Sequence, residues 1–330
     1  MRVAVFDTRS YDEAYLPAAA ATGGHDLVFF EPRLTTATAV LARGFVGVCS
    51  FVNDRLDEEC LRALAAGGTR FIVLRSAGYN HVDVAAAQRL GLRVARVPEY
   101  SPHAVAEHTF ALLLALVRRL PRAVARVRDA NFALDGLVGF DLHDKCIGII
   151  GTGRIGRIVA NIATGFGMKV VVNDVREDPS SGLQYVGMQE LLAVADVVTL
   201  HCPLTPATHH LIDERALAHM KAGAVLINTG RGALIDSRAL VRALKAERLF
   251  GAALDVYEEE EGVFFKDLSG QVLKDDVLAR LLTFPNVVIT AHQAFLTREA
   301  LTAIAETTMA NLTAFDQGAP PFANEPAAAR

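Results

Sequence analysis

The chain has 330 residues, of which 52% are hydrophobic, and its 33 basic and 37 acidic side chains give a formal net charge of −4. This length and apolar content predict two α/β domains with large cores, and the weak charge argues against a polyanion-binding protein. A local group of arginines is typical of a solvated helix face rather than of a nucleic-acid site. The group comprises Arg118, Arg119, Arg122, Arg126 and Arg128.

The amino-terminal residues lead directly into a predicted strand at residues 3–6. No signal-peptide pattern precedes this strand, and the chain has no run of about 18 uncharged apolar residues that predicts a membrane span. The cysteines form no C-x-x-C pair, so we expect reduced thiols in a cytoplasmic protein without a membrane partner. They are Cys49, Cys60, Cys146 and Cys202.

Strand-like and helix-like runs alternate through the first hundred residues, which predicts a parallel sheet covered by helices. Two prolines in residues 97–102 then indicate a rigid link at which the chain leaves this domain. The predicted strands are residues 3–6, 27–30, 47–50, 71–74 and 94–96, and the predicted helices include 57–66 and 82–90.

Residues 104–128 read as one long apolar helix that is kinked or broken near Pro121. A helix this apolar needs a cover, either another domain or another subunit. A second doubly wound sheet follows. Its predicted strands are 146–150, 169–173, 197–200, 224–228, 251–255 and 287–290, with helices at 155–163, 188–193, 214–220 and 237–245.

No strand follows the last predicted helix, residues 298–315, so this helix is free to return to the first domain. The tail at residues 317–330 is rich in proline and alanine, and we expect it to be loose.

Residues 151–156 match G-x-G-x-x-G between a strand and a helix, which is the context of a dinucleotide site. Gly151 permits the tight turn, Gly153 lets the backbone approach a pyrophosphate, and Gly156 allows close helix packing. Asp174 ends the next strand, where a carboxylate binds ribose hydroxyls and repels a 2′-phosphate, so NAD is predicted over NADP. The alternative is a ligand-free turn with three packing glycines. The predicted phosphate-binding residues are Gly151, Gly153, Arg154, Ile155 and Gly156.

Arg231, Glu260 and His292 each follow a predicted strand, and the carboxyl ends of parallel strands line the ligand crevice. Adding a hydride to a keto carbon leaves negative charge on oxygen, which a histidine can neutralise by donating a proton. A carboxylate orients the imidazole ring, and an arginine offers a planar fork to a substrate carboxylate. The alternative is that the histidine is a structural residue and that residues 258–261 are a solvated acidic run.

Residues 201–210 contain three histidines and a cysteine, which raises the question of a metal site. His209 and His210 are adjacent, so they would point in different directions on a regular helix or strand. Pro203 and Pro206 make the segment a loop, and we predict no metal site.

Several motifs resemble the D-2-hydroxy acid dehydrogenases: Asn-Thr-Gly-Arg-Gly at 228–232, Leu-Asp-Val-Tyr-Glu at 254–258 and Thr-Ala-His-Gln-Ala-Phe at 290–295. Residues 201–206 and the glycine fingerprint match as well. The runs at 264–265, 275–277 and 292–297 resemble the fermentative D-lactate dehydrogenase branch of that family. The resemblance covers nearly the whole chain, including residues 75–80 and 100–102.

The resemblance implies a role for each matching residue. His292 would be the acid/base, Glu260 its hydrogen-bond partner, chosen by its spacing from Asp255, and Arg231 the group that holds the substrate carboxylate. Tyr79 is larger than the usual aliphatic residue of the family, which leaves the shape of the pocket open. The implied substrate-binding residues are Ala77, Gly78, Tyr100, Arg231, His292 and Phe295. The implied cofactor-binding residues are His201, Cys202, Pro203, Thr208, Thr229, Gly230 and Asp255.

The resemblance also implies an α/β architecture of two doubly wound parallel-sheet domains. Residues 1–99 plus 299–330 would form a flavodoxin-like substrate domain, and residues 100–298 a Rossmann-like NAD domain. The helix from Ala104 would pack in the interface of a homodimer or homotetramer. The implied activity is NAD-dependent interconversion of a small 2-keto acid, pyruvate above all, and the D-2-hydroxy acid. The alternatives are a dehydrogenase for bulkier acids, such as phenylpyruvate or 2-ketoisocaproate, and an NAD-sensing protein similar to transcriptional corepressors.

Overall fold

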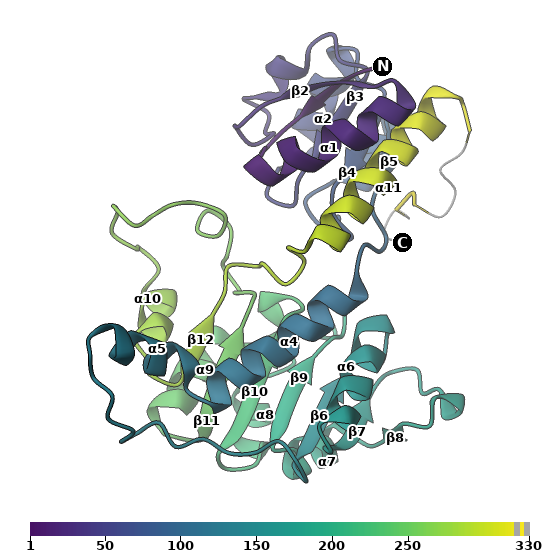
Figure 1. The fold of residues 1–330 in the computed structure, drawn as a ribbon. Helices are drawn as coiled ribbons and strands as arrows, with labels where there is room; N and C mark the ends of the chain where they lie inside the picture. The colour runs from purple at the N-terminus through teal and green to yellow at the C-terminus, as the bar shows by residue number, and fades with distance from the viewer. Residues whose placement is uncertain (320–323, 327–330) are drawn as a thin grey trace. The chain divides into compact units, whose positions relative to one another are not determined.

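The computed structural model describes residues 1–319 and 324–326. The chain forms two compact units, which Figure 1 shows as ribbons. Unit 1 comprises Met1–Ser101 and Leu296–Arg330, and unit 2 comprises Pro102–Phe295. The chain therefore leaves unit 1 after Ser101 and returns to it at Leu296.

Unit 1 contains a five-stranded parallel sheet with the order β2-β1-β3-β4-β5. This is the strand order of flavodoxin-like folds, as predicted. The strands are short, and β1, β3 and β4 are apolar runs because helices cover both of their faces. They are β1 Arg2–Val5, β2 Asp26–Phe29, β3 Gly47–Ser50, β4 Phe71–Leu74 and β5 Arg93–Ala95.

Two pairs of helices cover the sheet of unit 1 (Figure 1). One face packs against α1 (Ser10–Gly23) and α11 (Arg298–Asp316), so the last helix does return to the first domain. The other face packs against α2 (Glu58–Ala66) and α3 (Val84–Arg89), with the short helix η1 (Ala39–Ala42).

Unit 2 contains a seven-stranded parallel sheet with the order β12-β11-β10-β9-β6-β7-β8. Counted from β6, this is the Rossmann order 3-2-1-4-5-6 with one strand added beyond the sixth, which confirms the predicted fold class. The strands are β6 Cys146–Ile150, β7 Lys169–Asn173, β8 Gln184–Tyr185, β9 Val197–Leu200, β10 Ala224–Asn228, β11 Leu249–Leu254 and β12 Val287–Ile289.

Helices also cover both faces of the sheet in unit 2. On one face, Phe110 and Leu113 of α4 (Pro102–Val117) share a core with Ile147 and with α6 (Arg154–Gly165). The sheet of its own unit therefore covers the buried face of this apolar helix, while Glu107 and Ala111 on its other side are exposed, and its place in a subunit interface stays a prediction. The other face packs against α7 Met188–Val194, α8 Glu214–His219, α9 Ser237–Lys245 and α10 Asp276–Leu282.

The helix predicted at residues 104–128 is broken, as expected, close to Pro121. It forms α4 and a separate helix α5 (Leu120–Arg128), and Arg119 between them adopts a left-handed φ of 53°. Pro121 lies in the first turn of α5, where a missing N–H costs no hydrogen bond. No residue of α5 is buried in the single chain; of the arginine group, Arg118, Arg122 and Arg128 are exposed, whereas Arg119 lies over the ring of Phe250 and Arg126 donates to the carbonyl of Asp135. No helix within residues 1–319 and 324–326 has the length and apolarity to cross a membrane.

Part of the carboxyl-terminal tail is attached to β5. The backbone N–H of Arg96 donates to the carbonyl of Asn324 at 2.9 Å, and Arg93 forms an ion pair with Glu325 at 2.9 Å. The prediction of a loose tail is therefore wrong for residues 324–326, while residues 320–323 and 327–330 lie outside the described residues.

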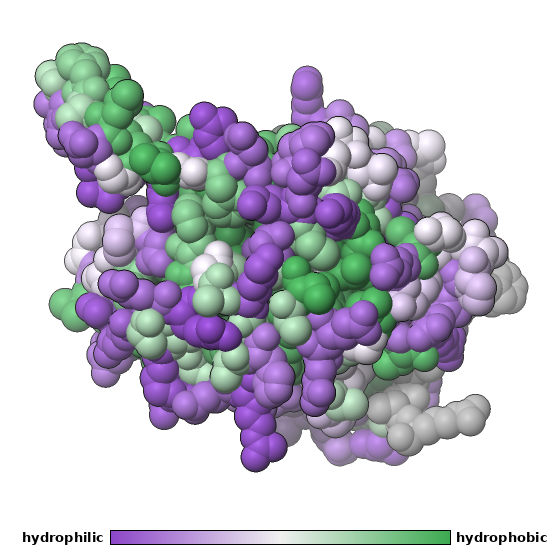
Figure 2. Space-filling view, turned by 90° about the horizontal axis from the view of Figure 1, so that it is seen from below, coloured by the Kyte–Doolittle hydropathy of each residue, from purple (hydrophilic) through white to green (hydrophobic). Residues whose placement is uncertain are grey.

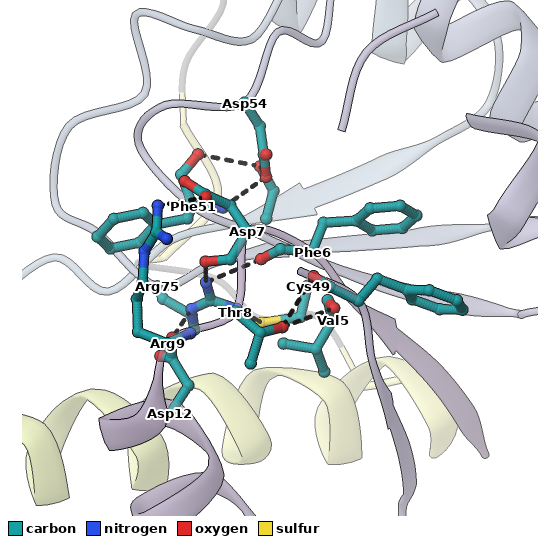
Figure 3. Close-up of polar contacts among 12 residues, drawn as sticks. Val5, Phe6, Asp7, Thr8, Arg9, Asp12, Cys49, Phe51, Asp54 and Arg75 are labelled. Carbon is teal, nitrogen blue, oxygen red and sulfur yellow. Dashed lines mark hydrogen bonds and ion pairs between the residues drawn. The ribbon is translucent and has the colours of Figure 1, made fainter. Parts of the chain in front are cut away.

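A buried network of charged groups joins the carboxyl ends of β1, β3 and β4 (Figure 3). The guanidinium of Arg75 lies 3.2 Å from the carboxylate of Asp12 and donates to the carbonyl of Phe6 at 3.0 Å. Asp54 accepts hydrogen bonds from the N–H groups of Leu34 and Phe51, each at 2.7 Å. Burial raises the pKa of Asp54 to about 6 in spite of these bonds. The network fixes the backbone immediately before the loop at residues 76–80.

Replacing Arg75 by methionine is expected to lower the free energy of unfolding by about 3–5 kcal/mol, because Asp12 would keep a buried charge without its partner. Urea unfolding followed by circular dichroism measures this loss. Arg62→Met is the matched control, since its ion pair with Glu58 is exposed and is worth at most about 1 kcal/mol. Equal losses in the two variants would contradict the structural role of the network.

Candidate active site

The turn between β6 and α6 has the geometry of a dinucleotide site. Gly151 has a φ of 99°, and a Cβ atom there would lie 2.5 Å from the backbone nitrogen of Cys202. A Cβ atom on Gly156 would lie 2.0 Å from the carbonyl oxygen of Gly151. At Gly153 a Cβ atom would meet nothing within 4 Å, so there is open space at the amino terminus of α6. A pyrophosphate fits this place, where free N–H groups and the helix dipole favour an anion.

Asp174 directly follows β7, at the position where a Rossmann fold binds ribose. Its carboxylate accepts hydrogen bonds from the backbone and the hydroxyl of Thr152, at 2.6 and 2.9 Å, and from the N–H of Arg176 at 2.9 Å. Burial alone would raise the pKa of Asp174, but these hydrogen bonds outweigh burial, so its pKa is lowered. The side chain is therefore a fixed, charged acceptor, as ribose recognition requires.

The loop after β9 meets the glycine turn at the topological switch point of the sheet, between β6 and β9. His201 and Cys202 therefore lie beside Gly151, where a cofactor contact was predicted. The ring of His201 is hydrogen-bonded to Thr199 at 2.9 Å, and burial lowers its pKa to about 4. The ring is thus neutral near pH 7, and burial raises the pKa of the Cys202 thiol to about 11.

The other predicted cofactor residues stabilise the loops after β9 and β10. The hydroxyl of Thr208 donates to the carbonyl of Pro203 at 2.7 Å and closes an exposed turn. The hydroxyls of Thr229 and Thr109 are 3.0 Å apart, and Gly230 follows directly in the chain. Contacts of these residues with the cofactor stay predictions.

His292 and Glu260 form the predicted hydrogen bond, with 2.9 Å between Nδ1 and Oε1. Glu259 and Glu261 are exposed, and Glu258 bonds to a different histidine. Glu260 is therefore the member of the acidic run that orients His292. With Nδ1 bound to the carboxylate, Nε2 is the ring atom that can exchange a proton with a substrate.

Asp255 holds the loop that carries His292. Its carboxylate accepts hydrogen bonds from the hydroxyl of Thr290 at 2.5 Å and from the N–H groups of residues 293–294 at 2.9 Å. His108 of α4, which the sequence reasoning missed, lies 3.4 Å away. Burial would raise the pKa of Asp255, but these contacts lower it on balance. The structure thus makes Asp255 a positioning residue, and its contact with the cofactor stays a prediction.

Arg231 lies after β10, and its side chain donates to the carbonyl of Gly230 at 2.8 Å. Gly232 places this segment against the next loop, because a Cβ atom there would lie 2.0 Å from the carbonyl of Tyr257. That loop continues to Glu260. Among the described residues, the guanidinium of Arg231 has no carboxylate partner, so it can donate hydrogen bonds to the carboxylate of a substrate.

The loop after β4 offers two hydrogen-bond donors. The carbonyls of Ala77 and Gly78 accept from Arg96 at 2.8 Å and from Ser76 at 2.7 Å. Their N–H groups bond to no other residue in the described part of the chain, and their contact with a substrate stays a prediction. Tyr79 packs against the core of unit 1 with the guanidinium of Arg96 over its ring, which accounts for its size.

Tyr100 and Phe295 lie at the two points where the chain passes between the units, and their contacts with substrate stay predictions. Phe265 was not predicted as a site residue, yet its ring lies 5.8 Å from the ring of His292. The only sequence signal for it was the aromatic pair at 264–265, which was used for the family resemblance alone.

His209 and His210 do not point in different directions, as the sequence reasoning assumed. Their rings stack with centroids 4.0 Å apart, because His210 adopts a φ of 52° in a turn. His210 Nε2 is hydrogen-bonded to Glu258. The argument against a metal site that relied on diverging rings is therefore wrong.

Comparison with known proteins identifies the family of this site. The D-isomer specific 2-hydroxyacid dehydrogenase NAD binding domain matches residues 110–294, which include the glycine turn, Arg231, Glu260 and His292. The chain belongs to the D-isomer-specific 2-hydroxyacid dehydrogenase family. The matched domain makes NAD the cofactor of this dehydrogenase.

Relatives of the dehydrogenase match over most of their length. The D-lactate dehydrogenase of Escherichia coli is 46% identical, over 96% of this chain and 98% of its own. The aromatic 2-oxoacid reductase of Clostridium sporogenes is 43% identical, over 89% of each chain. The solved structure of the pyruvate reductase of Chlamydomonas reinhardtii superimposes with a TM-score of 0.92 and 42% identity, over 97% of each chain.

The charge of Asp174 leads to a prediction about cofactor choice. We expect kcat/KM with NADH to exceed that with NADPH by at least about 100-fold, because a 2′-phosphate would face this carboxylate. Asp174→Ala should reduce the preference at least about tenfold, mainly by weakening NADH binding. Glu177→Ala is the control, since that side chain is exposed. Comparable efficiency of the unmodified enzyme with both cofactors would contradict the assignment.

Proposed function

We propose that this dehydrogenase reduces pyruvate to D-lactate with NADH and catalyses the reverse reaction. The observation that carries the proposal is the hydrogen bond between His292 and Glu260, accompanied by an arginine, Arg231, that has no carboxylate partner among the described residues. Relatives named D-lactate dehydrogenase and pyruvate reductase support the choice of substrate.

The chain's residues divide the reaction between them. NADH supplies the hydride when it is bound at the glycine turn. Arg231 binds the substrate carboxylate and polarises the keto group, and the N–H groups of Ala77 and Gly78 are further donors. His292 transfers the proton from Nε2 to the developing alkoxide, while Glu260 orients the ring and stabilises it when it is charged. In the oxidation of D-lactate, His292 accepts the hydroxyl proton.

An aromatic or branched 2-keto acid is the second candidate substrate, since one relative is an aromatic 2-oxoacid reductase. Steady-state kcat/KM values for pyruvate, 2-ketoisocaproate and phenylpyruvate, with chiral chromatography of the products, test the choice. We expect kcat/KM for pyruvate to exceed the other two values by at least about tenfold, which is within the range of discrimination that contacts with a few extra carbon atoms give, and the product to be the D-isomer. A lead for phenylpyruvate would favour the second candidate. Tight NADH binding without turnover of any acid would favour an NAD-sensing protein.

We further propose a homodimer or homotetramer that assembles through α5 and the segment after it. Apolar side chains gather on a projecting part of the surface in Figure 2. Phe132, Leu134 and Val138 are 73%, 78% and 82% exposed, which is costly for an isolated chain. Sedimentation as a monomer at micromolar concentration would contradict this assembly. We also propose a cytoplasmic location, which free thiols at all four cysteines fit and cell fractionation tests.

A further inference from the structure

Two histidines and a glutamate form a compact group in unit 2, apart from the residues assigned to the reaction. One ligand atom each from His209, His210 and Glu258 lies within 4.8 Å of the others. The left-handed backbone of His210 turns its ring onto that of His209, so both imidazoles face the same carboxylate. This arrangement requires the turn and does not arise from two adjacent histidines on a regular helix or strand.

The group has the chemistry of a transition-metal site. Two imidazole nitrogens and one carboxylate oxygen, with water in a fourth position, are a ligand set that Zn²⁺ accepts. Bonds of about 2.0–2.2 Å to a tetrahedral ion place its ligand atoms about 3.4 Å apart. His210 and Glu258 are in direct contact, so these two side chains have to separate to that spacing, and the exposed side chain of His209 has to move toward them.

The backbone of unit 2 holds two of the three ligands in place. The second carboxylate oxygen of Glu258 accepts a hydrogen bond from the N–H of Ser237, at the start of α9, at 3.2 Å. The N–H of His210 donates to the carbonyl of Ala233 at 2.8 Å. The first hydrogen bond orients the Glu258 carboxylate and the second fixes the backbone that carries the His210 ring, so less entropy is lost when an ion binds.

We propose that His209, His210 and Glu258 form a binding site for one divalent transition-metal ion, with Zn²⁺ as the best-fitting ion. The ion replaces the hydrogen bond between His210 and Glu258 and recruits His209 as the third ligand. It connects the loop after β9 to the loop after β11. The proposal does not depend on which keto acid the enzyme reduces.

Isothermal titration calorimetry of the full-length protein with ZnCl₂ tests the site. We expect one ion per chain with a Kd in the micromolar range, and a rise in Tm when Zn²⁺ is present. His209→Ala should weaken this binding at least about 100-fold, because even the loss of a residue that only supports a ligand costs about 10–100-fold. Without metal, the His209→Ala variant should have the same Tm as the unmodified protein, since the His209 side chain is exposed.

His143→Ala is the matched control, because His143 is an exposed histidine beside a carboxylate, Asp144, in the same unit. It should retain the stoichiometric site with unchanged affinity. Visible absorption of the Co²⁺-loaded protein gives a second readout, which should show a tetrahedral spectrum that His209→Ala loses. Equal Zn²⁺ affinity of the unmodified protein and His209→Ala, or no stoichiometric binding to the unmodified protein, would overturn the proposal.

Discussion

His292→Ala is expected to lower kcat for 2-keto acid reduction by at least about 1,000-fold while the Kd for NADH changes less than about threefold. The imidazole is bound through Nδ1 to Glu260, and its Nε2 is the proton donor of the proposed reaction. Alanine removes the donor without touching the glycine turn of the cofactor site. Steady-state and single-turnover oxidation of NADH measure the loss of turnover, and the change in NADH fluorescence on binding measures the Kd for NADH.

Two further variants make this experiment specific. Glu260→Gln keeps a hydrogen-bonding side chain but removes the charge that stabilises the protonated ring, so kcat should fall about 10–100-fold. His143→Ala removes an exposed histidine of unit 2 and should leave kcat unchanged. If His292→Ala retained more than about a tenth of the activity, His292 could not be the general acid of the reaction.

Gly156→Ala is expected to raise the Kd for NADH at least about 100-fold and to destabilise unit 2. The new Cβ atom would lie 2.0 Å from the carbonyl oxygen of Gly151, and backbone on both sides leaves neither group free to move aside. The turn must therefore open, which displaces the N–H groups at the start of α6 that bind the pyrophosphate. Fluorescence titration with NADH and thermal unfolding measure the two effects.

Gly165→Ala is the matched control, because it lies in the same helix and its Cβ atom would meet nothing within 4 Å. Alanine has a higher helix propensity than glycine by about 1 kcal/mol, so this variant should be as stable as the parent and bind NADH normally. Normal NADH binding by Gly156→Ala would show that the turn tolerates a side chain, and would contradict the claim that the contact with the Gly151 carbonyl requires glycine at residue 156.

Much of the fold was predictable because central parallel strands are buried on both faces. The runs at 47–50, 71–74 and 146–150 therefore match their strands residue for residue. Short or atypical elements were missed. Strand β8 has two residues, too few for a pattern, and α1 contains Pro17, a residue that normally argues against a helix.

The residues of the site were predictable only where they belong to a short sequence motif. The glycine turn and Asp174 depend on local geometry, which the spacing of the residues specifies. The partner of His292 was chosen from four glutamates by family spacing alone, and the turn after Tyr257 supplies the physical reason. His108 and the stacked pair at 209–210 depend on contacts between distant segments and on a left-handed residue, which no periodicity reveals.

A crystal structure of the complex with NADH and oxamate, a non-reacting analogue of pyruvate, tests the central claim most directly. We expect the oxamate carboxylate to accept a bidentate pair of hydrogen bonds from Arg231. We also expect Nε2 of His292 to donate to the neighbouring carbonyl oxygen of oxamate while Nδ1 remains hydrogen-bonded to Glu260. An oxamate bound with Arg231 elsewhere, or with the imidazole of His292 turned away from it, would contradict the assignment of these residues to the reaction.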